Sequence, residues 1–144
     1  MDAIAKLLIE QECRNVVLRA AAFADGHNPV GLALLFTPDA VLVRPNEPPI
    51  IGRDGIRQAY ERRPKERLTR HLVTNTMVEV ESHSHARACS YVLLWTGSAL
   101  DESGPHGRLA DERKLVGEFN DVFSLGLDGQ WLIQRREARF VLHN

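Results

Sequence analysis

The first part of the chain carries apolar residues at helical spacing. Residues 1–24 place them three and four positions apart, which predicts one long helix with a single buried face. Asp2 can cap its start, and the helix is expected to end at Asp25-Gly26, with Gly26 in the left-handed conformation that closes many helices. The predicted buried face consists of Ile9, Cys13, Val16, Val17, Ala20, Phe23 and Ala24.

Two shorter helices are predicted to follow. Asn28-Pro29 opens the second, with Asn as the N-cap and Pro at the first helical position. Its apolar face is Leu32, Leu35 and Phe36, and residues 37–39 end it. A short strand over 39–44 comes next, and prolines 45, 48 and 49 confine the following stretch to a sheet edge or a loop. The third helix is predicted over residues 55–62.

The second half of the chain changes to strand periodicity. Its segments are long and rich in β-branched and aromatic residues, which predicts strands over 69–81, 86–96, 114–125 and 131–142. Residues 82–84 and 127–130 are hairpin turns, and 99–112 form a long loop. Helices followed by antiparallel strands in hairpin order define an α+β fold. Strands this long must twist and curl, so helices on the concave side would enclose a cavity for a small ligand.

Strand alternation selects the side chains expected to share one face of the sheet. Core packing explains most of them. Asp121 among aromatics is the exception, because a buried carboxylate needs a partner, which Arg70, Arg135 or Arg136 could supply. Such a pair fits a structural role and a substrate contact equally well. The predicted faces are His71, Val73, Asn75 and Met77; Cys89, Tyr91, Leu93 and Trp95; and Leu115, Phe119, Asp121 and Phe123.

Length, charge and cysteine content limit the function. The 144 residues suit a single domain over 1–144, and 44% apolar with 26% charged residues is ordinary globular composition. With a net charge of −1 the protein lacks the positive electrostatic potential that binding to phosphate backbones requires, so we do not expect nucleic acid as a partner. Without a secretory or membrane-spanning apolar run, we expect a cytoplasmic protein that does not bind membranes. Cys13 and Cys89 stand far apart and are expected to be free thiols.

Two other kinds of site are not expected. His83, His85 and His106 fall on a turn and a loop and match no metal-binding motif, so no metal site is predicted. No serine lies in a Gly-x-Ser-x-Gly elbow, which argues against a serine hydrolase.

Several segments resemble SnoaL-like proteins of the nuclear-transport-factor-two-like family. They occur in order along nearly the whole chain: residues 35–41, 52–56, 70–75, 117–123, and 128–133 followed by Arg136. The resemblance implies a cone-shaped, cystatin-like α+β barrel, with three N-terminal helices packed on a strongly curved, mostly antiparallel sheet. The fold surrounds an apolar ligand pocket, and it carries many unrelated activities.

The branch of this family that contains scytalone dehydratase and dehydrochlorinases implies a catalytic pair. That branch places an Asp at the end of the first helix and a His early in the first long strand, which fall here on Asp25 and His71. Ala20 stands where related dehydratases carry a Tyr. Chemically, a neutral imidazole is a natural base near pH 7, and a carboxylate behind it fixes its tautomer. The alternative is a helix-ending Asp and a sheet His with no catalytic role.

Three functions follow as hypotheses. The first is a cofactor-independent lyase or isomerase, similar to dehydratases or cyclases, that acts on an apolar ring compound. Asp25 and His71 would carry out the chemistry, and the expected ligand contacts are Asn75, Tyr91, Trp95, Phe119, Asp121 and Arg136. The second is a small structural subunit of a ring-hydroxylating dioxygenase, which residues 70–75 also resemble. The third is a non-catalytic ligand-binding or dimerisation module.

An apolar outer sheet face formed by Val116, Val122, Leu132 and Phe140 predicts a homodimer or homotrimer.

Overall fold

Helices and strands follow the predicted order in a computed structural model that describes residues 1–144. The helices are α1 (Ala3–Asp25), α2 (Pro29–Ala33) and α3 (Arg53–Glu61). The strands are β1 (Phe36–Val43), β2 (Ile50–Ile51), β3 (Arg67–Val80), β4 (His85–Ser98), β5 (Leu115–Leu125) and β6 (Trp131–His143). None of the helices is both long enough and apolar enough to cross a membrane.

The helix boundaries follow from local side-chain caps. The Asp2 carboxylate accepts a hydrogen bond from the Ala5 amide at 2.7 Å, and the Asn28 side chain accepts one from the Gly31 amide at 2.9 Å. The predicted left-handed conformation of Gly26 is wrong, because its φ is −86°. His27 takes the left-handed turn instead, with φ 51°. Its ring Nε2 donates to the carbonyl oxygen of Arg67 at 2.8 Å, which fixes this unusual backbone in place.

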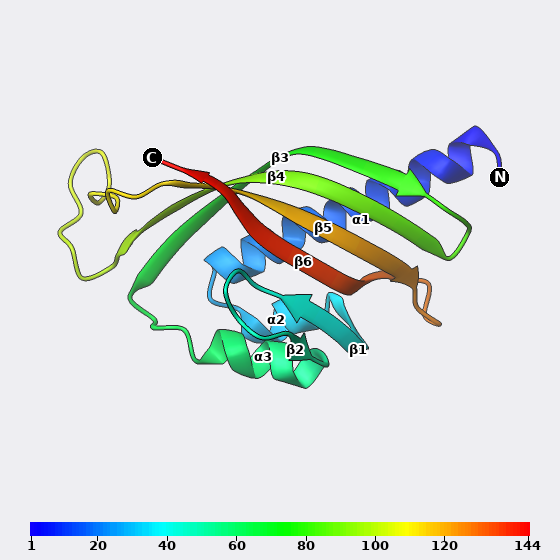
Figure 1. The fold of residues 1–144 in the computed structure, drawn as a ribbon, viewed down its shortest axis with the longest axis horizontal. Helices are drawn as coiled ribbons and strands as arrows, with labels where there is room; N and C mark the ends of the chain where they lie inside the picture. Colours follow the sequence, from blue (N-terminus) through cyan, green and yellow to red (C-terminus); the bar gives the residue numbers. More distant parts are fainter.

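The strands form one mixed sheet in the order β2-β1-β6-β5-β4-β3. Only β1 and β6 pair in parallel; every other neighbouring pair is antiparallel. The long strands β3 to β6 bend across α1, while α2 and α3 lie with β1 and β2 at the lower end of the view (Figure 1). The expected α+β, cystatin-like architecture is confirmed.

The core fills the space between α1 and the concave side of the sheet. It contains the predicted face of α1 together with β1, β5 and β6 side chains such as Phe36, Leu42 and Phe123. Trp131 and Ile133 lie on this covered face, with 6% and 0% of their surface exposed. The sheet and α1 therefore form the frame on which the remaining side chains are positioned.

Bulges change which side chains face the helices. In β3, Asn75 and Thr76 together stand opposite Ser90, and Asn75 has a left-handed φ of 54°. The extra residue reverses the alternation, so Thr76 turns inward and Met77 outward, where 76% of it is exposed. The prediction that Asn75 and Met77 share a face with His71 is therefore wrong.

A second bulge, at Gln134 in β6, determines where Arg136 lies. Phe123 pairs with Ile133, whereas Val122 pairs with Arg135, so Gln134 is the extra residue. Beyond it the inward positions change from odd to even numbers. Arg136 therefore shares the inner face with Ile133 and stands directly opposite Asp121 on β5.

Arg136 and Asp121 form a bidentate ion pair inside the protein. The guanidinium Nε and Nη2 atoms donate to the two carboxylate oxygens at 2.7 and 2.9 Å. Only 6% of Arg136 and 2% of Asp121 are exposed. Burial alone lowers the pKa of the Arg136 guanidinium, but the charge and hydrogen bonds of Asp121 outweigh burial and raise it. Arg136 is therefore the partner that the buried Asp121 requires.

Removing one member of this pair should strongly destabilise the fold. Asp121→Ala leaves a buried, unpaired guanidinium, which costs about 3–5 kcal/mol of unfolding free energy. The double variant Asp121→Leu/Arg136→Met should recover most of that loss. Urea-induced unfolding followed by circular dichroism measures both effects. A single variant within about 1 kcal/mol of the wild type would contradict the prediction.

Candidate active site

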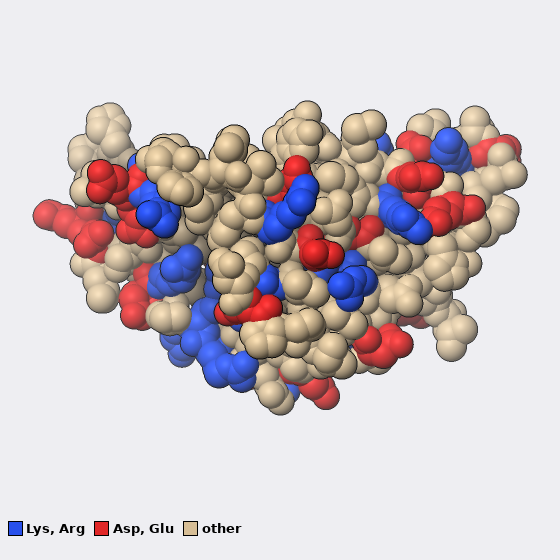
Figure 2. All heavy atoms as spheres, in the orientation of Figure 1, with Lys and Arg blue, Asp and Glu red and all other residues tan.

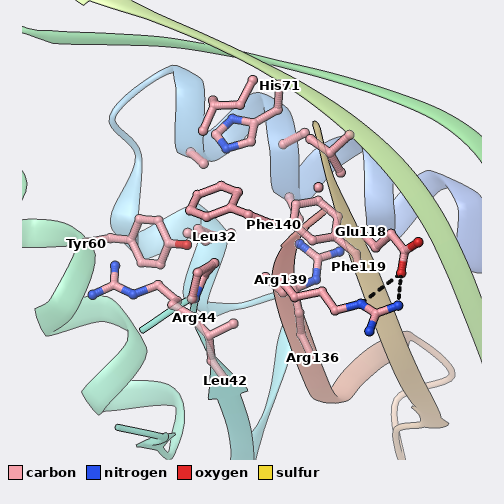
Figure 3. Close-up of a pocket in the computed structure, with 18 of the residues that line it drawn as sticks. Leu32, Leu42, Arg44, Tyr60, His71, Glu118, Phe119, Arg136, Arg139 and Phe140 are labelled. Carbon is pink, nitrogen blue, oxygen red and sulfur yellow. Dashed lines mark hydrogen bonds and ion pairs between the residues drawn. The ribbon is translucent and has the colours of Figure 1, made fainter. Parts of the chain in front are cut away.

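A cavity of about 270 Å³ lies between the helices and the inner face of the sheet. Its wall is largely apolar, with Ala20 and Ala24 from α1, Leu32 from α2 and Val92 from β4 among the lining residues. His71 lies at one end and Tyr60 and Arg44 at the other, with Phe140 between them (Figure 3). The volume is near the lower limit of typical ligand pockets, about 300 Å³, and therefore suits a small ring compound.

Asp25 and His71 meet at this cavity. Asp25 is the last residue of α1, and His71 faces inward from the early part of β3. The carboxylate Oδ1 lies 2.6 Å from the ring Nδ1 of His71, and Oδ2 accepts the His71 backbone amide at 3.0 Å. The buried Thr69 hydroxyl donates to Oδ1 at 2.9 Å. The predicted contact between the two side chains is confirmed, while their catalytic role stays a prediction.

These hydrogen bonds change the acidity of Asp25. Burial on its own raises the pKa of the carboxyl. The hydrogen bonds from the His71 ring and amide, the His71 charge and the Thr69 hydroxyl together outweigh burial, and they lower the pKa below its ordinary value of 3.8. Asp25 is consequently a carboxylate at neutral pH.

An ionised Asp25 determines the tautomer of a neutral His71 ring. A carboxylate can only accept hydrogen bonds, so Nδ1 must carry the proton at this contact. The lone pair of the neutral ring is then on Nε2, the other nitrogen, and His71 lines the cavity. The arrangement can take a proton from a bound molecule and hold the resulting imidazolium against the carboxylate.

Three other predicted site residues lie at or behind the cavity wall. Phe119 and Arg136 line it from β5 and β6, and the Arg136 guanidinium lies 4.0 Å from the centre of the Phe119 ring. Asp121 lies behind this wall and is fully engaged with Arg136. Asp121 therefore positions a lining residue rather than contacting the cavity itself.

Asn75, Tyr91 and Trp95 do not line the cavity, contrary to the prediction. Asn75 is exposed at the β3 bulge. Tyr91 and Trp95 do share a face of β4, but it is the outer one, where 48% and 47% of their surfaces are exposed. The Lys114 ammonium lies 4.9 Å from the centre of the Trp95 ring. The inner positions of β4 belong to small and aliphatic residues such as Ser90 and Val92.

Several cavity residues are absent from the prediction. Tyr60 and Arg63 line one end of the cavity. The spacing of Tyr60 from Ile56 on one face of α3 was a usable signal for Tyr60, whereas Arg63 follows the end of the helix. Phe140 was expected on the outer face with Leu132. The Gln134 bulge separates the two, and Phe140 enters the cavity instead (Figure 3).

Two of the histidines outside the cavity lie at one hairpin. His83 and His85 belong to the hairpin between β3 and β4, where the His85 Nδ1 lies 2.9 Å from the Ser84 hydroxyl. No group of three or more His, Cys, Asp or Glu side chains is arranged to hold a metal ion.

Comparison with known families decides where the chain belongs. Residues 5–137 match the model of the SnoaL-like domain. The chain belongs to the SnoaL-like family. Its curved sheet, three helices and internal cavity are the features that the family resemblance implied. No curated protein matches the sequence.

Solved structures share the SnoaL-like fold at low sequence identity. A putative scytalone dehydratase from Novosphingobium aromaticivorans is 22% identical, with a TM-score of 0.80, over 99% of this chain and 91% of that one. A type 2 hexachlorocyclohexane dehydrochlorinase (LinA) is 14% identical, with a TM-score of 0.81, over 99% and 92%. A protein from Catenulispora acidiphila, in complex with S-DNPA, is 24% identical, with a TM-score of 0.72, over 93% and 94%.

The lowered pKa of Asp25 predicts a pH-dependent contribution to stability. The unfolded chain binds the proton at higher pH than the folded one, so the stabilisation is complete above the unfolded pKa of about 3.9 and disappears as pH falls through the folded pKa. The wild type should exceed Asp25→Asn in unfolding free energy at pH 6, and the gap should shrink below about pH 4. Urea unfolding of both proteins between these pH values measures the gap. A gap independent of pH would contradict the assignment.

Proposed function

We propose that this protein is a cofactor-independent lyase or isomerase that acts on a small, largely apolar ring compound. Asp25 and His71 are its acid–base pair. The observation that carries the proposal is the 2.6 Å contact between the Asp25 carboxylate and the His71 ring at an apolar cavity. Two solved structures with the same fold are a putative scytalone dehydratase and a hexachlorocyclohexane dehydrochlorinase, and both of these names describe eliminations.

The proposed step begins with the removal of a proton from carbon. Nε2 of His71 takes a proton from a carbon next to a carbonyl or beside a leaving group, and Asp25 stabilises the imidazolium that forms. The electron pair of the broken C–H bond becomes the new double bond. In an elimination the leaving group departs, and the imidazolium supplies its proton. In an isomerisation the same proton returns to a different carbon, so both outcomes balance without another reactant.

The wall of the cavity suits an apolar ring. Phe119 and Phe140 offer aromatic faces, and Leu32 and Val92 offer aliphatic contacts. Apolar surroundings strengthen the electrostatic interaction of the base with Asp25. The shape of this wall would select the ring, and the Asp25–His71 pair would carry out the reaction.

The proposal can be tested without knowing the natural substrate. In D₂O the protein should accelerate the exchange of the hydrogens next to the carbonyl of 2-tetralone, a neutral two-ring ketone, as followed by proton NMR. His71→Gln should lower the protein-dependent rate by about 100- to 10,000-fold, the usual contribution of a positioned base. Asp25→Asn should also lower it severely, because the amide no longer enforces the tautomer with a free Nε2.

His83→Gln is the matched control, because His83 lies in an exposed turn away from the cavity. It should exchange 2-tetralone at the wild-type rate. An exchange rate that is the same in the wild type and in folded His71→Gln would overturn the acid–base role. Ligand binding without any such exchange would instead favour the non-catalytic binding module.

We further propose that copies of the chain associate through the outer face of β3 and β4. The predicted face of Val116, Val122, Leu132 and Phe140 is less suited to this role, because Phe140 lines the cavity and the other three are partly buried. The outer face of β3 and β4 exposes a set of large apolar side chains: Leu72, Met77, Tyr91, Leu93 and Trp95. Exposed apolar patches of this kind usually mark interfaces. Light scattering at micromolar concentration should give a homodimer or homotrimer, and Leu93→Lys should shift it towards monomer. A wild-type monomer would contradict this proposal.

A further inference from the structure

Charged side chains around the cavity are almost all neutralised by a partner. Arg136 pairs with Asp121, Arg139 with Glu118 and Arg44 with Glu47, at distances between 2.6 and 2.9 Å. His71 contacts Asp25. The two cavity-lining charges that take part in no ion pair are Arg63 and Arg67.

Arg63 lies at the end of the cavity that contains Tyr60, and Arg67, the first residue of β3, lines the same cavity. The Arg63 guanidinium stacks on the Tyr60 ring at 5.1 Å from its centre, and the paired Arg44 stacks on the same ring at 5.3 Å. Burial lowers the pKa of Arg63, and the charges of Arg67 and Arg44 lower it further. Basic side chains gather on the surface over the connection between α3 and β3 (Figure 2). This end of the cavity therefore has an excess of positive charge.

We propose that Arg63 and Arg67 bind an anionic substituent, a carboxylate or a similar oxyanion, on the ring compound that occupies the cavity. The inference rests on the proposed function and narrows its substrate class. Guanidinium groups recognise carboxylates through charge-assisted hydrogen bonds, and these two have all their donors free of protein carboxylates. Because Arg63 is already held against Tyr60, it loses little side-chain freedom when it binds.

The position of the arginines relative to His71 fits a ligand with two functional ends. Arg67, Thr69 and His71 alternate along β3 and share a face, so the backbones of Arg67 and His71 are about 13 Å apart along the strand. The long Arg67 side chain can bridge part of that distance. A ring held between Phe119 and Phe140 would then present its anionic end to the arginines and its reactive C–H to His71.

Two matched probes test the charge preference directly. 2-Naphthoate and 2-naphthamide have nearly the same shape and differ in charge, and neither needs to react. The wild type should bind 2-naphthoate about 10- to 100-fold more tightly than 2-naphthamide, as expected for charge-assisted hydrogen bonds. Higher salt should weaken only the naphthoate complex. NMR titration of the protein with each probe gives the two dissociation constants.

Variants assign the preference to the two arginines. Arg63→Gln/Arg67→Gln should bind both probes with similar affinity, whereas Arg62→Gln, an exposed neighbour outside the cavity wall, should keep the wild-type preference. Arg67→Gln alone, at an exposed position, serves as a milder variant whose folding is checked by circular dichroism. Equal affinities in the wild type, a preference retained by the double variant, or no naphthoate binding at millimolar concentration would each overturn the anion site.

The anion site and the acid–base function fail in different ways. Loss of the naphthoate preference with 2-tetralone exchange intact overturns the anion site alone. Absence of exchange with the naphthoate preference intact overturns the acid–base function alone.

Discussion

The Asp25 carboxylate is the point at which the helices, the sheet and the cavity meet. It sits at the C-terminal end of α1, where the helix dipole disfavours a negative charge. Three donors from β3 compensate: the Thr69 hydroxyl, the His71 amide and the His71 ring. The same contacts attach the long helix to the first long strand and orient the imidazole in the cavity. One side chain therefore links the stability of the fold to the geometry of the proposed site.

Much of the secondary structure was predictable, because each half of the chain keeps one periodicity. The predicted limits of the four long strands lie within two residues of the observed ones. The errors begin at bulges, since one inserted residue exchanges the two faces without any change in composition. Asn75 tolerates a left-handed backbone and was a weak signal of this kind; Gln134 gave none. The prediction for Tyr91 and Trp95 was wrong for another reason. Both faces of β4 carry apolar residues, so alternation alone cannot identify the concave face.

The proposed site was only partly predictable. Asp25 and His71 were selected because a family resemblance supplemented a simple chemical argument. The residues alone favoured a helix end and a sheet histidine. Arg63 comes from the connection after α3, and Arg67 is the first residue of β3. The fold brings both to the wall of the cavity, where Arg63 and Arg44 lie against the Tyr60 ring. No pattern in the linear sequence indicates that these side chains line the same cavity. Arg63 and Arg67 stand out in the structure because every other charged side chain at the cavity contacts an oppositely charged partner.

The two ends of the cavity influence each other through their charges. Asp25 is close enough to Arg63 to oppose the fall in its pKa, so the field of each end extends to the other. The positive charges of Arg63 and Arg67 disfavour another positive charge nearby. The proposed reaction creates such a charge on the His71 ring when it accepts a proton. A bound anion would cancel that repulsion inside a cavity of low polarity, where charge interactions are strong. The anionic end of a substrate would then do more than hold it in place: by neutralising Arg63 and Arg67, it would help Asp25 to stabilise the imidazolium on which the chemistry depends.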